Sequence, residues 1–239
     1  MCRMRRRRLV RSRTPARCGD ATAVNLGIRG FPPIRVSPFF PWEKKTAWLT
    51  VRTRQAFHPF HVTTRLCLEL FGAWKDRLFR ADTRFLDVGC GTGILALAAV
   101  KLGAGRAVGV DISASAIACS RENARLNGLW ERVFWVHGSL EAIGGSFSCV
   151  AANVPWTCWE NLGDAVTDRV AEGGALIASG FQDIQAAVME RRLKEKGINP
   201  VDCRQGDLTF FGVPPSGSFT WCAVLAVRSP SHGVPPPSP

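Results

Sequence analysis

The segment that decides the fold is Leu86-Asp87-Val88-Gly89-Cys90-Gly91-Thr92-Gly93. The apolar run over Thr83–Val88 predicts a short buried strand, and the glycines that follow let the chain turn sharply into a helix expected over Ile94–Leu102. A strand, a glycine loop and a helix in this order are typical of α/β folds that bind a nucleotide-like ligand at the loop. The segment therefore predicts a ligand site at the amino end of this helix.

The glycine spacing and the nearby charge distinguish between two nucleotide ligands. A dinucleotide-binding loop has the pattern GxGxxG, and this chain has Ile94 where the third glycine would stand. Asp87 places a carboxylate at the strand end, which would repel a pyrophosphate and attract a cation. S-adenosylmethionine carries a sulfonium and an ammonium group. We therefore expect this cofactor rather than NAD, bound at Asp87, Gly89, Gly91 and Gly93.

A second acidic residue follows the next predicted strand. Asp111 comes directly after the apolar run Ala107–Val110 and lies 22 residues beyond Gly89. A carboxylate at this place can accept hydrogen bonds from both hydroxyls of a ribose. The alternative role is capping of the helix that starts near Ser113, and the two roles are compatible.

Strands and helices alternate along the rest of the chain as far as residue 228. Further strands are expected at Val133–Val136, Ser148–Ala152, Ala175–Ser179, near Val201 and at Thr220–Val227, with helices at Ser113–Leu126, Glu160–Val170 and Gln182–Lys196. This alternation predicts a Rossmann-like α/β fold, with a mostly parallel seven-stranded sheet, helices on both faces and an antiparallel C-terminal strand. Because ligands bind beyond the carboxyl ends of such strands, Ile112 and Ser139 are expected beside the adenine ring.

The fourth predicted strand ends in Asn153-Val154-Pro155-Trp156, where a methyl acceptor would meet the cofactor. The Asn153 amide offers an oxygen to an N–H of the acceptor, and Trp156 offers an aromatic face to a flat or cationic group. We predict both as catalytic residues, and Asn153 as a cofactor contact as well. For Trp156, packing in the core is an alternative with equal support.

Charge is distributed unevenly along the 239 residues, whose net charge is +12. The first 54 residues contain 14 Lys or Arg and two acids, whereas the remainder contains 17 bases and 17 acids. Together with the scattered prolines, this predicts four regions. They are a disordered basic arm over 1–40, a linker and cover segment over 41–62, a methyltransferase domain over 63–228 and a disordered Pro-rich tail over 229–239.

The roles of the arm remain open at this stage. It could contact RNA, serve as a transit peptide or be a solvated tail, and its removal is expected to leave the melting temperature unchanged. No apolar run reaches the roughly 18 residues of a membrane-spanning helix, so a cytoplasmic protein without membrane contact is expected. The nine cysteines form no CxxC pair, and His58 and His61 have no acid or thiol nearby, so no metal site is predicted.

Taken together, these residues resemble the PrmA family of methyltransferases, which methylate large-subunit ribosomal protein eleven. The resemblance covers residues 56–228 and rests on Ala56-Phe57, His61–Thr64, Asp87–Ala99, Lys101–Ala104, Val110–Ile112, Glu122–Ala124, Asn127-Gly128 and Ala152-Asn153. It implies a class I methyltransferase fold. It also implies that Thr64, Gly89, Asp111 and Asn153 contact the cofactor, as the matching family residues do.

The chain departs from the family in two places. The segment Phe57–His61 is one residue shorter than its counterpart and has no glycine, and the basic arm stands where the family has a folded domain that grips the ribosomal protein. Asn153–Trp156 is also similar, at three of four positions, to the Asn-Pro-Pro-aromatic motif of enzymes that methylate a glutamine or adenine nitrogen.

From these patterns we expect a methyltransferase that acts on a nitrogen of a protein, with a ribosomal protein as the candidate substrate and RNA contact through the arm. A glutamine or nucleic-acid adenine N-methyltransferase is the first alternative. A non-catalytic cofactor-binding protein that acts through its basic arm is the second. No oligomeric state is predicted.

Overall fold

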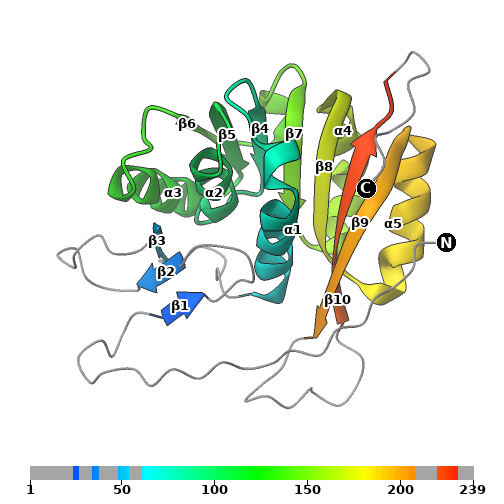
Figure 1. Cartoon of the computed structure of the whole chain (residues 1–239), viewed down its shortest axis with the longest axis horizontal. Coiled ribbons are helices and arrows are strands. Elements are labelled where there is room, and N and C mark those ends of the chain that lie inside the picture. Colours follow the sequence, from blue (N-terminus) through cyan, green and yellow to red (C-terminus); the bar gives the residue numbers. More distant parts are fainter. Residues whose placement is uncertain (1–23, 27–33, 38–47, 54–60, 208–219, 231–239) are drawn as a thin grey trace.

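The structure is a computed structural model that describes residues 24–26, 34–37, 48–53, 61–207 and 220–230 (Figure 1). Its large sheet contains β4 (Arg84–Val88), β5 (Arg106–Asp111), β6 (Val133–His137), β7 (Phe147–Asn153), β8 (Val170–Gln182), β9 (Ile198–Asp207) and β10 (Thr220–Arg228). The helices are α1 (Val62–Leu78), α2 (Ile94–Lys101), α3 (Ala114–Leu126), α4 (Trp156–Asp168), α5 (Asp183–Glu195) and the short 3-10 helix η1 (Leu140–Ala142).

The seven strands are ordered β6-β5-β4-β7-β8-β10-β9. All neighbouring pairs are parallel except those of β10, which runs antiparallel to both β8 and β9. The predicted fold, including its antiparallel C-terminal strand, is therefore confirmed. The strand order reverses between β4 and β7, which is where ligands bind in open α/β sheets.

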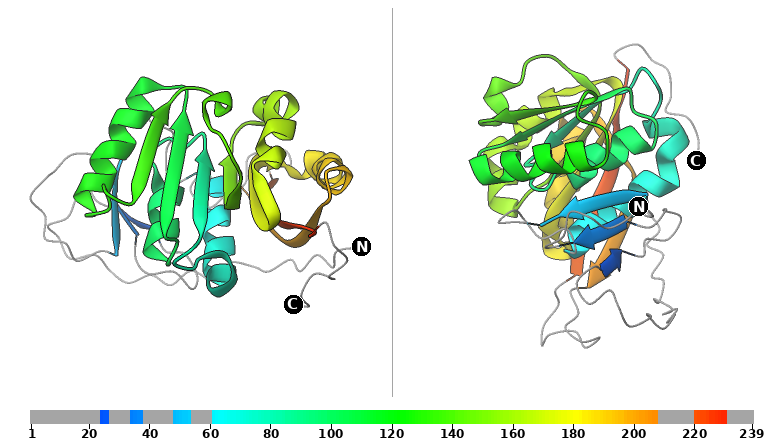
Figure 2. Two further views of the ribbon diagram at one scale, coloured as in Figure 1. Left: turned by 90° about the horizontal axis from the view of Figure 1, so that it is seen from above. Right: turned by 90° about the vertical axis from the view of Figure 1, so that its left-hand side faces the viewer.

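Two hydrophobic cores cover the two faces of this sheet (Figure 2). Phe85 and Ile177 pack on one face with residues of α1 and α2, and their chain neighbours Leu86 and Leu176 pack on the other with residues of α4 and α5. Successive residues of a strand point to opposite faces, so apolar neighbours of this kind require a sheet that is buried on both sides. Within the described residues, none of the helices is both long enough and apolar enough to span a membrane.

Helix α1 is an element that the sequence patterns did not predict. His61 precedes it and accepts a hydrogen bond at Nδ1 from the Thr63 N–H (3.3 Å), which caps the helix. Leu66, Leu70 and Phe71 are almost fully buried on one side of the helix. This spacing is that of an amphipathic helix, although the β-branched residues at its start lower the helix propensity there.

A separate three-stranded sheet lies beside α3 and contains β1 (Val24–Leu26), β2 (Ile34–Ser37) and β3 (Leu49–Arg52). Strand β2 pairs with β1 antiparallel and with β3 parallel, and Ile34, Leu49 and Val51 have no exposed surface. The prediction of disorder over residues 1–40 is wrong for β1 and β2. The arginine run Arg5–Arg8 and residues 231–239 lie outside the described residues.

Strand β3 is joined to α3 by asparagine side chains rather than by another strand. The Asn123 amide accepts from the Arg52 N–H (2.8 Å) and donates to the Arg52 carbonyl (3.0 Å). Asn127, one helical turn later, makes the same pair of bonds with Thr50 at 2.9 and 2.6 Å. Asn123 also donates to the carbonyl of Thr92 in the glycine loop (2.9 Å). The small sheet is therefore bonded through α3 to the predicted ligand site.

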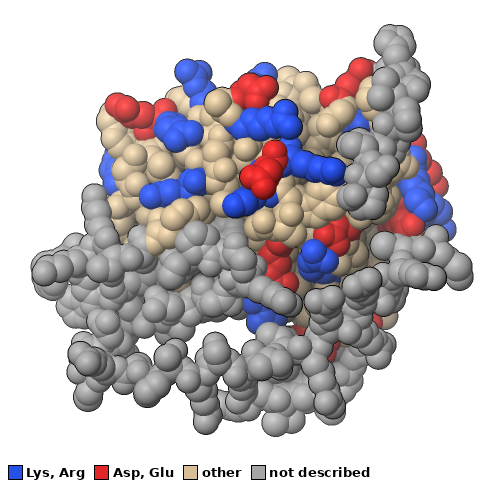
Figure 3. Space-filling view, viewed as in Figure 1, with Lys and Arg blue, Asp and Glu red and all other residues tan. Residues whose placement is uncertain are grey.

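Charged residues are mixed over the described surface shown in Figure 3. Lys and Arg side chains lie among Asp and Glu side chains across this face. The mixture agrees with the even balance of bases and acids beyond residue 54. On this face the folded body offers no extended area of positive charge for a nucleic acid backbone.

Candidate functional site

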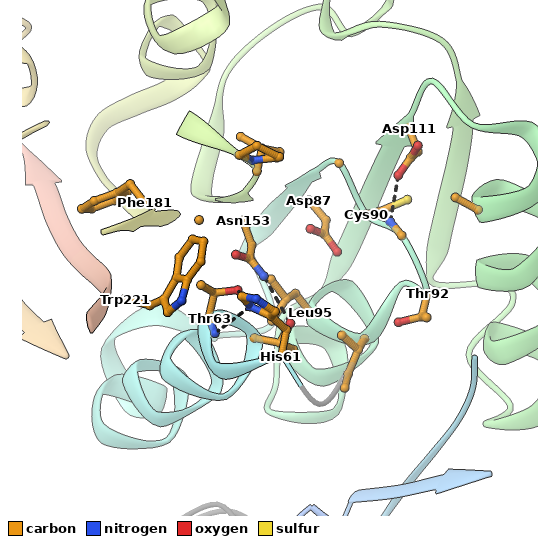
Figure 4. Close-up of a pocket in the computed structure, with 18 of the residues that line it drawn as sticks. His61, Thr63, Asp87, Cys90, Thr92, Leu95, Asp111, Asn153, Phe181 and Trp221 are labelled. Carbon is orange, nitrogen blue, oxygen red and sulfur yellow. Dashed lines mark hydrogen bonds between the residues drawn. The ribbon is translucent and has the colours of Figure 1, made fainter. Parts of the chain in front are cut away.

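A cavity of about 510 Å³ lies at the carboxyl ends of β4, β5 and β7. Its wall is formed by the start of α1, the glycine loop, the turn after β7, the end of β8 and the start of β10 (Figure 4). The sequence-predicted residues Thr64, Asp87, Asp111 and Asn153 are brought together on this wall from four different elements. The strand order explains this, because each residue lies at or near the same edge of the sheet.

The glycine loop adopts backbone conformations that side chains disfavour. Gly89 and Gly91 have φ values of +69° and +54°, in the left-handed region. The Gly89 and Cys90 N–H groups donate to the Val110 carbonyl at 2.9 and 3.1 Å, so the loop is fixed to the end of β5. Both glycines line the cavity, where the missing side chains allow a ligand to lie close to the backbone.

Asp111 uses both carboxylate oxygens to hold the loop in place. One oxygen accepts from the Gly91 N–H (2.9 Å) and the other from the Ser113 N–H (2.8 Å). Each oxygen keeps a further lone pair, so ribose hydroxyls can bind there without breaking either contact. Ser113, and not Asp111, caps α3 by accepting from the Ala116 N–H (3.3 Å).

Asp87 is far less accessible than its place at a strand end suggested. The side chain is 1% exposed and accepts one hydrogen bond from the Ala96 N–H of α2 (3.0 Å). Burial, with a smaller contribution from the Asp111 carboxylate, raises the pKa of Asp87 from 3.8 to about 7. Asp87 therefore lies against the cavity beneath the loop, and near neutral pH its carboxyl group is close to half protonated.

This shift predicts a pH dependence of stability. Below pH 7 and above pH 3.8 the folded chain holds a proton on Asp87 that the unfolded chain has released, so the resulting stabilisation is lost as the pH rises towards 7. Relative to Asp87→Asn, the free energy of unfolding of the cofactor-free protein should therefore fall with pH, by about 4 kcal/mol at most. Urea denaturation of both proteins at pH 5 and pH 8 tests this. Asparagine retains an acceptor for the Ala96 N–H, and parallel pH profiles would contradict the prediction.

Asn153 presents a buried acceptor that no other group uses. Its Nδ2 donates to the Thr64 hydroxyl (3.2 Å), while its Oδ1 is buried and has no hydrogen-bond partner among the described residues. Thr64 is itself 2% exposed in the first turn of α1. A buried acceptor left without a donor costs about 1–3 kcal/mol. Its position on the cavity wall leaves this oxygen available to a hydrogen-bond donor that enters the cavity.

Trp156 lies at the start of α4, where it lines the cavity and also packs against neighbouring side chains, and its catalytic role stays a prediction. Its ring lines the cavity and also packs edge-on to Phe181, with ring centroids 6.3 Å apart. The Arg192 guanidinium lies 5.5 Å from the ring centroid, and the indole N–H donates to Glu160 (3.0 Å). Trp156 is thus a fixed part of the wall that leaves some of its surface open to the cavity.

Three predicted cofactor residues are not among those that line the cavity. Gly93 faces the opposite side of the loop, where an added Cβ would lie 2.4 Å from the Trp135 ring. Ile112 is 79% exposed directly after Asp111, and Ser139 is exposed at the start of η1. Contact of Ile112 and Ser139 with an adenine ring stays a prediction, supported for Ile112 by its exposed apolar side chain.

His61, Phe181 and Trp221 line the cavity although the sequence patterns did not place them there. The His61 ring stands edge-on to Trp221, with centroids 5.1 Å apart, and its Nδ1 lies 2.8 Å from the Thr63 hydroxyl. Burial lowers the pKa of His61. The sequence patterns predicted no metal site at His61 and His58, and His58 lies outside the described residues.

The strand order, the glycine loop after β4, the acid at the end of β5 and the asparagine at the end of β7 together are those of class I methyltransferases. The sequence profile of the family described as "Ribosomal protein L11 methyltransferase (PrmA)" matches residues 58–206. The chain therefore belongs to this family.

Two individual proteins of this name show how far the similarity extends. The relative from Neisseria meningitidis serogroup C is 40% identical over 176 residues, which cover 70% of this chain and 57% of the relative. The chain thus spans little more than half the length of this curated relative. The crystal structure of ribosomal protein L11 methylase from Lactobacillus delbrueckii subsp. bulgaricus has a TM-score of 0.65 at 26% identity and covers 87% of this chain and 99% of that chain.

A more distant structure shares the fold alone. Magnesium protoporphyrin IX methyltransferase from Synechocystis PCC 6803, solved with bound SAM, has a TM-score of 0.54 at 19% identity. The superposition covers 66% of this chain and 76% of that chain. The Rossmann-like arrangement is therefore shared by proteins whose names give unrelated substrates, so the substrate has to be argued from the site.

Proposed function

We propose that this chain is an S-adenosylmethionine-dependent methyltransferase that acts on a nitrogen atom of a protein. The observation that carries the proposal is the buried, unpartnered Oδ1 of Asn153 on a cavity wall that also contains the glycine loop and Asp111. The Asn153 oxygen suits a hydrogen-bond donor such as an N–H group, and the glycine loop with Asp111 suits a nucleoside. A methyl donor and a nitrogen acceptor bound side by side meet both requirements.

The residues of the cofactor half fit S-adenosylmethionine in shape and charge. Asp111 would hold the ribose hydroxyls, and the left-handed backbone at Gly89 and Gly91 leaves room for close approach. Asp87 and Asp111 are the only acids among the described residues that line the cavity, and both lie beside the glycine loop. Carboxylates suit the positive charge of this cofactor, which when bound supplies a methyl group open to attack by a nucleophile.

The acceptor half of the cavity differs in chemistry from the cofactor half. Asn153 Oδ1 would accept an N–H of the acceptor nitrogen and so direct its lone pair inward. Trp156, Phe181 and Trp221 form an aromatic wall, and no described acid lines this half. No described carboxylate is therefore available here to pair with an ammonium, and the nitrogen needs a free lone pair to attack the methyl group, so it has to react in its neutral form. For lysine, whose unperturbed pKa is about 10.4, this means loss of a proton before transfer.

A ribosomal protein is the substrate that we infer within this proposal. The support is membership of the family, because the relatives at about 40% identity are named for a ribosomal protein of the large subunit. The same membership favours a protein over a nucleic-acid adenine as the acceptor. A cytoplasmic location, and RNA contact through the basic residues before position 54, are parts of the proposal that rest on the sequence.

Incubation with methyl-labelled cofactor tests the activity directly. Purified protein is mixed with ribosomal proteins, with ribosomal RNA and with DNA, and the labelled fraction is identified in each case. Label in a ribosomal protein supports the proposal, whereas label in RNA or DNA would show that the enzyme methylates nucleic acid instead. Cofactor binding without transfer to any of the three would point to a non-catalytic binding protein.

The role of Asn153 makes a sharper prediction for the same assay. Asn153→Ala should lower kcat by about 10- to 100-fold, because a hydrogen bond to a nitrogen that gains positive charge contributes about 1.5–3 kcal/mol. The cofactor KM should change less, since the contact strengthens only as charge develops. Asn161→Ala, on the exposed side of α4, is the matched control. An Asn153→Ala protein with normal kcat at saturating substrates would refute the catalytic role.

A further inference from the structure

Strand β8 contains a bulge beside the turn that carries Asn153. In the pairing with β10, Ser179 is opposite Ala223 and Phe181 is opposite Cys222, which leaves Gly180 as an extra residue on β8. Gly180 has a φ of +92°, a conformation that residues with a side chain rarely adopt. Bulges of this kind bend a strand and redirect the side chains that follow, and they are frequent next to active sites.

The bulge allows the backbone after β7 to lie directly on β8. A Cβ at position 180 would be 2.0 Å from the Val154 carbonyl oxygen and 2.6 Å from the Val154 carbonyl carbon. These are backbone atoms, so no rotation of a side chain can relieve the overlap. Asn153 is the last residue of β7 in register with β8, opposite Ser179, and the turn begins immediately after it. Only glycine at position 180 is compatible with this path of the turn.

The same turn touches the glycine loop on its other side. A Cβ at Gly89 would lie 2.7 Å from Cγ1 of Val154. Val154 therefore packs between two glycines, one on the cofactor loop and one on β8. Both Gly89 and Gly180 line the cavity, as does Val154 itself. Val154 can lie this close to the loop and to β8 only because Gly89 and Gly180 have no side chains. These two contacts thus fix the distance from the loop to Asn153.

We propose that Gly180 is a positioning residue for methyl transfer, since it sets the place of Asn153 relative to the cofactor loop through the Val154 backbone. This inference rests on the proposed function. It adds the residue that aligns the cofactor half of the cavity with the acceptor half. Gly180 itself makes no contact that requires a functional group. Its effect is on geometry, and a misplacement of the order of 1 Å at reacting groups can lower a rate by about 100-fold.

The test compares two alanine substitutions on one strand. Gly180→Ala introduces the Cβ that meets Val154, whereas Gly173→Ala, also on β8 with a φ of +67°, meets no atom within 4 Å. Both substitutions place an alanine in the left-handed region of φ, which lowers stability. Only Gly180→Ala also displaces the turn. We expect Gly180→Ala to lower kcat by about 100-fold, with a cofactor Kd from calorimetry close to that of the natural chain. Gly173→Ala should leave both quantities unchanged.

A second readout does not depend on activity. The side-chain amide signals of Asn153 in an NMR spectrum of the cofactor-free protein should shift in Gly180→Ala and stay in place in Gly173→Ala. If the natural chain transfers no methyl group to any substrate, the proposed function fails, but this spectrum still decides whether Gly180 places Asn153. Asn153 signals that are unchanged in a folded Gly180→Ala protein would overturn the inference.

A third variant covers the case in which Gly180→Ala does not fold. Val154→Ala keeps the bulge and removes the side chain that packs against Gly89. The turn then loses one of its two contacts, so a smaller loss of kcat and a shift of the Asn153 signals are expected. Unchanged kcat and unchanged signals in this variant would overturn the part of the inference that ties the turn to the cofactor loop through the Val154 side chain.

Discussion

Replacement of Asp111 by alanine is expected to weaken the binding of S-adenosylmethionine by about 100-fold or more. Two hydrogen bonds from ribose hydroxyls to a carboxylate contribute about 1.5–3 kcal/mol each. The substitution also removes the acceptors of the Gly91 and Ser113 N–H groups, so the loop loses one of its attachments to the end of β5 and keeps those to the Val110 carbonyl. Isothermal titration calorimetry with the cofactor and with its demethylated product measures the loss in both cases.

Asp111→Asn separates the two contributions to this effect. The asparagine keeps an oxygen for one of the two backbone donors but loses the charge, so it should bind the cofactor with an intermediate affinity. The melting temperature shows whether either variant is generally unstable. If Asp111→Ala binds the cofactor as tightly as the natural chain, the ribose assignment is wrong and the carboxylate only braces the loop.

Removal of residues 1–40 is expected to lower the free energy of unfolding by about 3–5 kcal/mol. This reverses the expectation drawn from the sequence, where the arm contributed nothing to stability. The deletion removes β1 and β2, including the fully buried Ile34, which packs in the same core cluster as Leu49 and Val51 on β3. Urea denaturation monitored by tryptophan fluorescence gives the free energy of unfolding for each protein.

Two controls identify the cause of this loss. Deletion of residues 1–23 ends before β1 and should cost much less. Ile34→Ala in the full chain removes part of the same buried surface and should account for a substantial share of the effect. Equal stability of the two truncated proteins would mean that the small sheet does not stabilise the fold.

The large sheet could be predicted because its strands are buried on both faces and carry uninterrupted apolar residues. The predicted bounds are wrong where glycine or proline, which usually mark a turn, stand inside a strand or at the start of a helix. The strand predicted at Ala175–Ser179 extends over Val170–Gln182, so Gly173 and Gly174 lie within β8. Helix α4 begins at Trp156 rather than near Glu160, because Pro155 has a φ of −53° and already serves as its N-cap.

The cofactor half of the site could be predicted because its residues follow strand ends within short motifs. Gly89, Asp111 and Asn153 reach the cavity through local chain geometry and the strand order alone. Phe181 and Trp221 could not be placed in this way. Their positions depend on the antiparallel pairing of β10 with β8 and on the bulge between them, which no periodicity in the sequence reveals.

The N-terminal strands could not be predicted for a different physical reason. Within the described part of the chain, strand β3 has no neighbouring strand on the side of α3, and backbone groups of Thr50 and Arg52 bond to the side chains of Asn123 and Asn127 instead. Strand prediction relies on alternating apolar residues and on turn residues. A strand whose backbone bonds to side-chain amides instead of to another strand shows neither pattern. Ile34 stands beside two prolines, which further hides the short strand β2.

The burial of the Cys90 thiol affects whether the protein could methylate itself at the site. A methyl donor can alkylate any strong nucleophile within reach, and Cys90 lies in the loop against which the cofactor would rest. Thiolates react in this way, whereas protonated thiols are weak nucleophiles. Cys90 is 5% exposed, and its burial, together with the Asp87 and Asp111 carboxylates, raises the pKa of the thiol. Burial, with a smaller contribution from the two acids that suit a cationic cofactor, thus keeps the protein's own sulfur protonated, so under the proposed function it does not compete with the substrate for the methyl group.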